Sequence, residues 1–344
     1  MELKEMLREL CEATGLSGWE LGASEVAEKY LRAYTQEVRR DIMGSLIGHI
    51  PGKGRKILLD AHMDEIGMVV TAVDEHGFIK VAKSGGVDLR MLLGSEVTVW
   101  TESGPLYGVF CCRPPHLIAS AADYTKAPEL QELAVDIGYS AQRAKELAVP
   151  GDKVTFRRNF HELMEGKVTC KSLDDRAGVA SILYCLDLLK DKQYDCDITA
   201  LFSVQEEVGT RGAGPGAFGV MPQEAIAVDV SFAMTPDSPR YKCGDLGKGP
   251  MIGVSPVLSR RISGDFQKLA KENKIPYQME IMGGETGTNA DVISITGAGA
   301  ETGLLSIPLR YMHSPVEVAV LEDIENTGRL IAQYILSIGG APRD

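Results

Sequence analysis

The chain has 344 residues, of which 44% are hydrophobic, and it carries a formal net charge of −12. This length suits more than one ordinary domain, or a single large α/β domain with an insertion. The negative charge argues against a nucleic acid or an anionic membrane surface as a partner.

Targeting signals and cysteines indicate the compartment. The N-terminal segment Met1–Leu10 is charged throughout and lacks the apolar stretch of a signal peptide, and no apolar run approaches the length of a transmembrane helix. The seven cysteines are scattered, odd in number and without C-x-x-C spacing, which indicates neither a disulfide framework nor a thiolate zinc site. These features predict a cytoplasmic protein.

The first 67 residues have the mixed pattern of an α/β domain. Helical spacing of apolar residues predicts a first helix that stops at Gly15–Gly18, and a second helix from about Glu20 to Tyr34. Short strands are expected after them, at Glu37–Arg40, Leu46–Ile50 and Ile57–Leu59.

His62 and Asp64 come directly after the last of these strands. A histidine in this position can bind a metal ion through one ring nitrogen, while a carboxylate fixes its tautomer through the other. Taken alone, such a pair more often belongs to a polar loop, so a metal site requires further ligands elsewhere in the chain.

The character of the chain changes between residues 68 and 165. Short β-prone runs alternate here with glycine-rich turns, which predicts a small all-β domain inserted into an α/β domain of residues 1–67 and 166–344. The expected elements are strands at Met68–Val73, Phe78–Ala82, Glu96–Val99, Tyr107–Cys111 and Lys153–Phe156, and a helix near Ser140–Leu147. The histidines of this segment lack an acidic partner at ligand spacing and are interpreted as surface or structural residues: His76, His116 and His161.

Carboxylates gather at the ends of elements where the α/β pattern resumes. A helix is expected to open at Asp174 and Asp175, which is more than a helix cap requires. The expected strand Asp197–Phe202 is followed by Glu206 and Glu207. Because ligands of open α/β sheets bind beyond the carboxyl ends of the strands, these two glutamates stand where chemistry is expected.

The rest of the chain presents two further candidates. Asp229 lies inside the apolar run Ala225–Val230, where a carboxylate is costly unless it is paired or bound to metal. His313 follows the expected strand Ala300–Ile307. The other expected elements are a loop over Thr235–Val257, a helix over Ser259–Asn273, a strand over Tyr277–Met282, a helix opening within Gly283–Asp291 and a last helix over Val316–Ser337.

Together these residues make a candidate metal centre. Its ligands are His62, one of Asp174 and Asp175, Glu207, Asp229 and His313. Imidazole and carboxylate without thiolate suit zinc, manganese or cobalt. Two ions bridged by one aspartate would each take one histidine and one further carboxylate, and a water bridging them would attack a polarised carbonyl. Glu206 would stay unligated, free to act as the general base.

The candidate ligands fall in five short segments: Ala61–Gly67, Leu173–Gly178, Gln205–Ala213, Val228–Val230 and Tyr311–Pro315. At all five, and in the same order, the sequence resembles the M42 family of metallo-aminopeptidases, which includes glutamyl and deblocking aminopeptidases and the TET peptidases. The resemblance covers essentially the whole chain, including the insertion.

The resemblance implies a zinc-peptidase-like α/β fold of the phosphorylase/hydrolase type, with a central mixed sheet flanked by helices and a PDZ-like dimerisation domain as its insertion. It implies that one metal ion is held by His62, Asp174 and Asp229. A second ion would be held by Asp174, Glu207 and His313. The family's bridging ligand is the first acid of its pair, which favours Asp174 over its neighbour.

The resemblance also implies the roles around the metals. Asp64 would orient His62, Glu206 would be the base, and the peptide bond between Asp174 and Asp175 would be cis. Zinc is the expected metal, with cobalt or manganese as alternatives. Short peptides are the expected substrates, and the expected assembly is a dimer-based, hollow tetrahedral dodecamer.

The chain departs from the family pattern at two positions. Asn289 stands where members commonly carry Asp, and Ser45 stands where they often carry Asn. Neither position is a proposed ligand, so the predicted metal site is unaffected. The preference among N-terminal residues of the substrate stays open.

Three other functions account for fewer of these residues. A deacylase would use the same metal pair on an acylated amino acid or a small amide. A glycosidase needs two carboxylates and no metal, so it leaves both histidines and Asp229 unexplained. A non-catalytic binding or scaffold protein would not need an unligated Glu206 beside five ligands. The dinuclear aminopeptidase is therefore the leading hypothesis.

Overall fold

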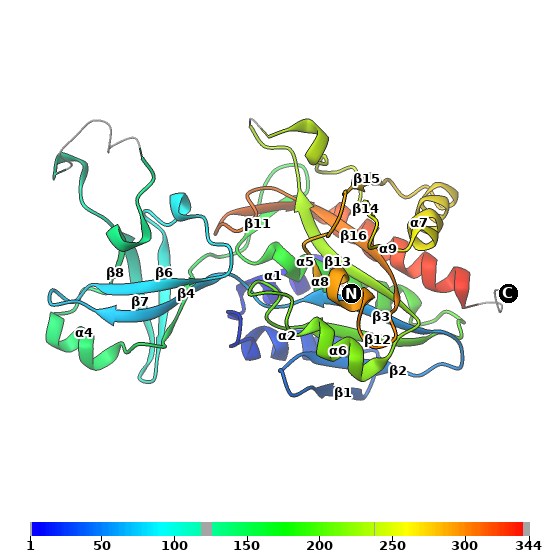
Figure 1. Cartoon of the computed structure of the whole chain (residues 1–344), viewed down its shortest axis with the longest axis horizontal. Coiled ribbons are helices and arrows are strands. Elements are labelled where there is room, and N and C mark those ends of the chain that lie inside the picture. Colours follow the sequence, from blue (N-terminus) through cyan, green and yellow to red (C-terminus); the bar gives the residue numbers. More distant parts are fainter. Residues whose placement is uncertain (1, 118–125, 237, 340–344) are drawn as a thin grey trace.

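A mixed sheet lies at the centre of the α/β part of the chain, in a computed structural model that describes residues 2–117, 126–236 and 238–339 (Figure 1). Four neighbouring strands at its centre run parallel, and antiparallel strands flank them on both sides. In spatial order the eight strands are β1 (Glu37–Arg40), β2 (Leu46–Ile50), β12 (Asp197–Ser203), β3 (Lys56–His62), β13 (Glu224–Phe232), β16 (Glu301–Leu309), β14 (Met251–Val254) and β15 (Gln278–Ile281).

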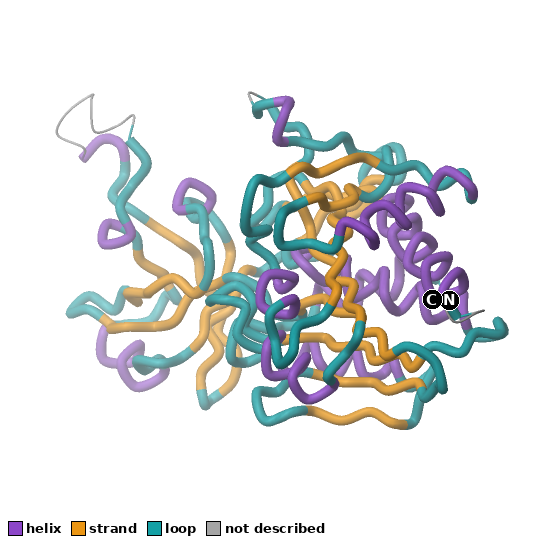
Figure 2. Tube along the Cα trace, turned by 45° about the vertical axis from the view of Figure 1, so that its right-hand side comes forward, coloured by secondary structure: helices purple, strands orange, loops and turns teal. Residues whose placement is uncertain are grey.

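Helices cover the two faces of this sheet unequally (Figure 2). Successive side chains of a strand point to opposite faces, so Ile57 and Leu59 join the main core while Leu58 joins a smaller cluster on the other side. The main core contains residues of α1 (Leu3–Glu12), α2 (Leu21–Leu31), α5 (Leu173–Leu189), α7 (Arg260–Glu272) and α9 (Leu321–Ile338). The second face is covered by two shorter helices, α6 (Ala213–Val220) and α8 (Asn289–Ser294).

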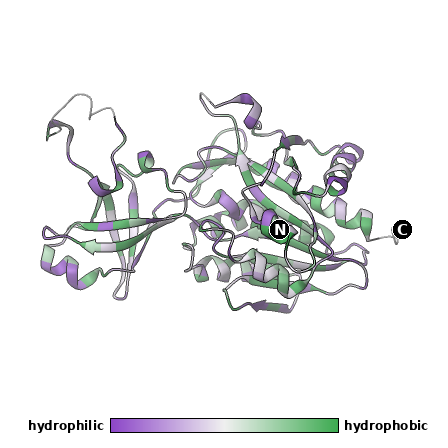
Figure 3. Ribbon diagram, viewed as in Figure 1, coloured by the Kyte–Doolittle hydropathy of each residue, from purple (hydrophilic) through white to green (hydrophobic). Residues whose placement is uncertain are grey.

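No helix in the described part of the chain combines the length and the hydropathy that crossing a bilayer requires. Hydrophobic residues lie along the strands of the central sheet and on the helices that pack against it, as Figure 3 shows. The predicted α/β architecture with a central mixed sheet is therefore confirmed.

The β-rich segment that follows β3 forms a closed barrel beside the α/β body, at the left of Figure 1. It has its own hydrophobic core, built around residues such as Met68, Val97 and Phe110. The helix α4 (Ala141–Leu147) begins after Ser140, whose side chain accepts a hydrogen bond from the Arg143 N–H. The barrel strands, in spatial order, are β4 (Gly67–Val73), β5 (Ile79–Ser84), β8 (Ala134–Asp136), β7 (Gly104–Cys111), β6 (Glu96–Thr101) and β9 (Lys153–Phe156).

A small three-stranded sheet joins the exit from the barrel to the C-terminal part of the chain. It contains β10 (His161–Glu162), β11 (Lys167–Cys170) and β17 (Glu317–Val320). The expectation of one helix over Val316–Ser337 is wrong at its start, because β17 pairs with β11 and the helix α9 begins only at Leu321. The β-branched valines of this run suit a strand.

The loop expected over Thr235–Val257 is also interrupted by a strand. Residues Met251–Val254 form β14, which lies between β16 and β15. A run of four residues between Pro250 and Ser255 is too short to show a clear period in the sequence. This strand matters for function because it extends the sheet on the side where the cavity described below is found.

Candidate active site

The predicted site residues meet at one edge of the central sheet. His62 is the last residue of β3, Asp229 lies near the end of β13, and Asp174 lies at the start of α5. A cavity of about 770 Å³ opens here, and its lining includes Asp174, Glu206, Asp229 and His313. The parallel strands β3, β12, β13 and β16 all end at this edge, which explains why residues far apart in the sequence converge.

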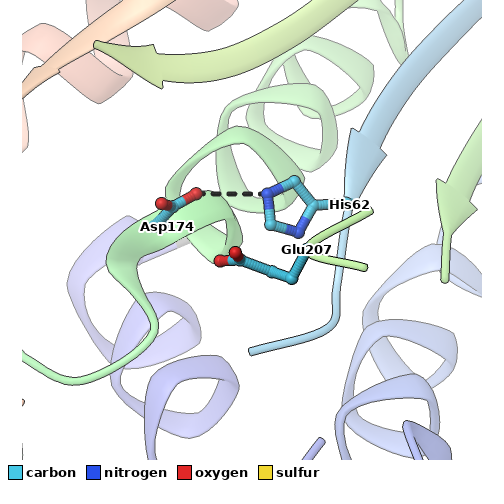
Figure 4. Close-up of side chains that lie close together, drawn as sticks. All are labelled: His62, Asp174 and Glu207. Atoms are coloured by element: carbon cyan, nitrogen blue, oxygen red, sulfur yellow. Dashed lines mark hydrogen bonds and ion pairs between the residues drawn. The ribbon is translucent and has the colours of Figure 1, made fainter. Parts of the chain in front are cut away.

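Asp174 lies between two imidazole rings. One of its carboxylate oxygens is 3.1 Å from His62 Nε2 and the other is 3.4 Å from His313 Nε2. Glu207 Oε2 is 3.3 Å from the same nitrogen of His313. Figure 4 shows Glu207 beneath the contact between His62 and Asp174. Asp174 is therefore shared between the two imidazole rings, with one carboxylate oxygen near each.

Two sets of side chains come close enough to hold a metal ion. Ligand atoms of His62, Asp174 and Glu207 lie within 4.8 Å of one another. The same holds for His62, Asp175 and Asp229. Both acids of the pair at the start of α5 are therefore near a metal-binding group, and the peptide bond between them is cis.

Asp174 and Asp175 differ in their surroundings. Burial alone would raise the pKa of Asp174, but hydrogen bonds from His313 and His62 outweigh it and hold the pKa below its usual range. Burial raises the pKa of Asp175, whose Oδ1 accepts the Gly178 N–H at 3.0 Å. Asp174 is thus the acid that the two histidines keep ionised.

The acids of the site are not neutralised by basic side chains. Burial raises the pKa of Glu207 and of Asp229, and neighbouring acids raise both further. Among the described residues, no lysine or arginine forms an ion pair with either of them. Buried carboxylates beside imidazoles and without a basic partner are a donor set that fits a divalent metal ion.

Asp64 holds several parts of the site in place. Its carboxylate accepts the Glu206 N–H at 2.9 Å, the Glu207 N–H at 3.2 Å and the Ser17 hydroxyl at 2.7 Å. Its Oδ1 is 3.4 Å from His62 Nδ1, which is an ion-pair distance rather than a short hydrogen bond. One buried carboxylate therefore holds the backbone of the two glutamates and lies beside the His62 ring.

Glu206 lies beside the metal-binding group and lines the cavity. Its Oε2 is 4.0 Å from His62 Nε2. Burial is the main cause that raises the pKa of Glu206 to about 7. The nearby charge of Asp174 raises this pKa further, whereas His62 lowers it. A carboxylate with such a pKa can both accept and return a proton near neutral pH.

Glu317 supports the site and was not predicted from the sequence. Its two carboxylate oxygens accept the backbone N–H groups of His313, at 3.0 Å, and Asp174, at 3.1 Å. It is fully buried, and burial raises its pKa. The only signal in the sequence is an acid within a valine-rich run, and that acid follows His313 by four residues.

The barrel also reaches the site. His313 Nδ1 is 3.1 Å from the carbonyl oxygen of Gly86, in the segment that follows β5. A Cβ atom at Gly86 would lie 2.4 Å from the same nitrogen, and one at Gly85 would lie 3.3 Å from the Glu207 side chain. The absence of side chains at Gly85 and Gly86 therefore allows this loop to pack against two candidate ligands.

Asn289 is buried below the site. Its Nδ2 donates to Asp60 Oδ2 at 2.9 Å and to Ser203 Oγ at 2.8 Å. It is not among the residues that line the cavity. The amide donates to a carboxylate that burial holds at a pKa of about 6. An effect of this position on substrate preference would therefore have to be indirect.

Three known proteins that this chain resembles are peptidases. The chain is 36% identical over 329 residues to the lysyl aminopeptidase of Pyrococcus furiosus, covering 95% of this chain and 94% of the relative. An aminopeptidase from Desulfurococcus kamchatkensis is 33% identical, with a TM-score of 0.90 over 100% of this chain and 99% of that structure. The Pyrococcus horikoshii TET1 peptidase, which can assemble into a tetrahedron or a large octahedral shell, is 32% identical, with a TM-score of 0.86 over 97% and 99%.

These matches make the chain a peptide hydrolase. The model of the M42 glutamyl aminopeptidase family matches residues 44–330. The chain therefore belongs to the M42 glutamyl aminopeptidase family, as its sequence motifs predicted.

Proposed function

We propose that this chain is a dinuclear-metal aminopeptidase that removes N-terminal residues from short peptides. The observation that carries the proposal is the position of Asp174 between His62 and His313, with Glu206 beside it in the same cavity. The names of the relatives, which include lysyl and glutamyl aminopeptidases, support the same activity.

In the proposed arrangement His62, Asp174 and Asp229 hold one divalent ion, and Asp174, Glu207 and His313 hold the other. Bound ions at this place polarise the scissile carbonyl and make a water molecule more acidic. The donor set suits zinc, with cobalt or manganese as alternatives.

Glu206 is the proposed general base. It would take a proton from the attacking water and return it to the nitrogen of the leaving group. Its carboxylate faces the cavity, and its backbone N–H donates to Asp64, which limits its movement. Asp64 is proposed to position His62, Glu206 and Glu207 without touching the substrate, because it contacts all three and is fully buried.

The proposal extends to the assembly. We propose that residues 68–165 are a PDZ-like domain that mediates dimerisation, and that residues 1–67 and 166–344 are the catalytic domain. The tetrahedral assembly of a relative supports a dodecamer built from such dimers. Measurement of the mass in solution should therefore give twelve times the mass of one chain. We further propose that the enzyme is cytoplasmic and needs neither nucleic acid nor membrane.

The test of the chemistry is the substitution Glu206→Gln. It keeps the side-chain volume and removes the base, so kcat should fall by roughly 10²- to 10⁴-fold while the bound metal, measured by elemental analysis, stays unchanged. A matched control is Glu102→Gln, at an exposed position on the barrel. Full activity in Glu206→Gln would remove the proposed base.

The class of substrate is tested with metal-loaded enzyme. Free-amine peptides should be hydrolysed from the N-terminus, and N-acetylated versions of the same peptides should not. Hydrolysis of the acetylated peptides alone would indicate a deacylase, and the absence of hydrolysis of any peptide with added zinc, cobalt or manganese would reject the proposal.

A further inference from the structure

A second carboxylate lies in the same cavity, away from the metal-binding group. Glu280, in the edge strand β15, lines the cavity together with Ser231 and Ser306. The Ser231 hydroxyl donates to Oε1 of Glu280, and the Ser306 hydroxyl donates to Oε2 at 2.6 Å. Both oxygens are therefore oriented by one donor each, and each has room for a further donor.

Glu280 has no basic partner in the described part of the chain. Burial raises its pKa, and the only groups that lower it are the two serine hydroxyls. Two basic residues line the same cavity, Arg240, which is paired with Asp245 at 2.7 Å, and the exposed Lys242, and neither forms an ion pair with Glu280. A partly buried carboxylate held by neutral donors favours a cation that comes from outside the chain.

The register of the sheet gives the separation from the metal-binding group. Asp229 and Ser231 are two residues apart in β13, so they point to the same face with about 6.6 Å between them along the strand. Ser306 in β16 is the direct neighbour of Asp229. The carboxylate of Glu280 accepts hydrogen bonds from both serines. The distance between the carboxylates of Glu280 and Asp229 is therefore about the length of one long side chain.

Part of the cavity lining is apolar. Met251, Met279, Met282 and Leu304 line the cavity. Methionine side chains are flexible and polarisable, and they pack well against a chain of methylene groups. Lysine and arginine side chains bury such a stem while keeping a charged end available for a carboxylate.

Resting on the proposed aminopeptidase function, we infer that Glu280 selects substrates whose N-terminal residue is lysine or arginine. The α-amine would lie at the metal-binding group, the stem of the side chain would pack on the methionines, and the ammonium or guanidinium would bind Glu280. Ser231 and Ser306 orient this carboxylate and thereby fix the direction from which the cation is bound.

The inference is tested with the 4-nitroanilides of lysine, arginine, leucine and glutamate. Metal-loaded wild-type enzyme should have its highest kcat/KM on the lysyl and arginyl substrates. Glu280→Gln should lower kcat/KM for the lysyl substrate by roughly 10- to 100-fold, mainly through KM, because a charged hydrogen bond is replaced by a neutral one. Its kcat/KM for the leucyl substrate should stay close to the wild-type value.

Two further variants sharpen the test. Glu285→Gln removes an exposed acid of the same cavity wall and should keep the preference for lysine. Ser231→Ala removes one orienting hydroxyl and should weaken that preference less than Glu280→Gln does. Retained activity on the leucyl substrate reports that each variant is folded and binds metal.

The outcomes separate this inference from the function on which it rests. If the wild type cleaves the leucyl substrate but does not favour the basic ones, the inference fails and the aminopeptidase proposal stands. The inference also fails if Glu280→Gln loses activity equally on lysyl and leucyl substrates, or if Glu285→Gln loses the preference to the same extent. If neither the nitroanilides nor peptides with the same N-terminal residues are cleaved, the proposed function itself fails.

Discussion

The side-chain amide of Asn289 donates hydrogen bonds to two buried acceptors. Its NH₂ group donates to both Asp60 and Ser203, all three of them buried. An aspartate at this position would offer no donor and would place a second carboxylate against Asp60. Two donated hydrogen bonds therefore hold the NH₂ group of Asn289 in this pocket.

Asn289→Asp should destabilise the protein. The change removes the donated hydrogen bonds and buries two like charges together, which is expected to lower the free energy of unfolding by about 1–3 kcal/mol. Urea denaturation followed by circular dichroism measures it. Asn159→Asp, at an exposed loop position, is the control and should unfold like the wild type. Equal stability of both variants would contradict the role given to Asn289.

The candidate ligands could be predicted from the sequence because their chemistry is unusual where it occurs. Asp229 is an acid inside an apolar strand, and His62 and His313 lie at or just beyond strand ends. Such groups need partners, and the parallel strands bring those partners together. Glu317 could not be predicted, because it binds backbone N–H groups of His313 and Asp174. The sequence alone does not show which acid accepts these two N–H groups, because only the fold places them beside Glu317.

At the scale of elements, periodic segments were predictable and short ones were not. The buried residues of α1 recur at helical spacing and identify the helix at once. The strands β8 and β14 have three and four residues, and their place depends on neighbours that are distant in the sequence. The sequence predicts a helix over β17, because the pairing of this strand with β11 is not visible locally.

His49 joins three strands at one side of the central sheet. Its Nδ1 is 2.8 Å from Glu37 in β1 and its Nε2 is 2.8 Å from Asp197 in β12. The hydrogen bond with Glu37 is the largest cause that raises the pKa of His49. The charged form of this histidine is therefore favoured by folding.

This gives a stability that depends on pH. Because the folded pKa is raised, the contribution of His49 is fully present below the unfolded pKa near 6.5 and is lost as pH rises through the folded pKa. His49→Gln should lower the melting temperature more at pH 6 than at pH 9. Since the ring is partly exposed, the effect should be about 1 kcal/mol or less.

Calorimetric scans at the two pH values measure this difference. His76→Gln, at an exposed turn of the barrel, serves as the matched control and should give a smaller difference between them, because its ring has no carboxylate within hydrogen-bond distance among the described residues. A loss of stability in His49→Gln that is the same at pH 6 and pH 9 would mean that packing, and not charge, accounts for the effect.

At the scale of the whole molecule, bound metal should be a major source of stability. Any ion that binds the folded chain alone stabilises it by mass action, by about 3–4 kcal/mol at 100 to 1,000 times its dissociation constant. Exhaustive chelation should therefore lower the melting temperature by roughly 5 °C or more, and added zinc should restore it. Scanning fluorimetry with and without chelator measures the shift.

The variant His313→Ala is the control for this experiment. It lacks one proposed ligand, so its melting temperature should respond less to chelation than that of the wild type. Identical shifts in the two proteins would show that the stabilising metal binds elsewhere. The absence of any shift in the wild type would contradict a metal centre that is coupled to folding.

The contact between Gly86 and His313 has a consequence for how this chain can be recombined. The barrel is inserted as a single stretch and has its own core, so it looks exchangeable between relatives. Yet the Gly86 carbonyl contacts the ring of a candidate ligand, and no larger residue fits there without displacing that ring. A chimaera that replaces the barrel must therefore keep the Gly85–Gly86 loop if the His313 ring is to stay in its present position.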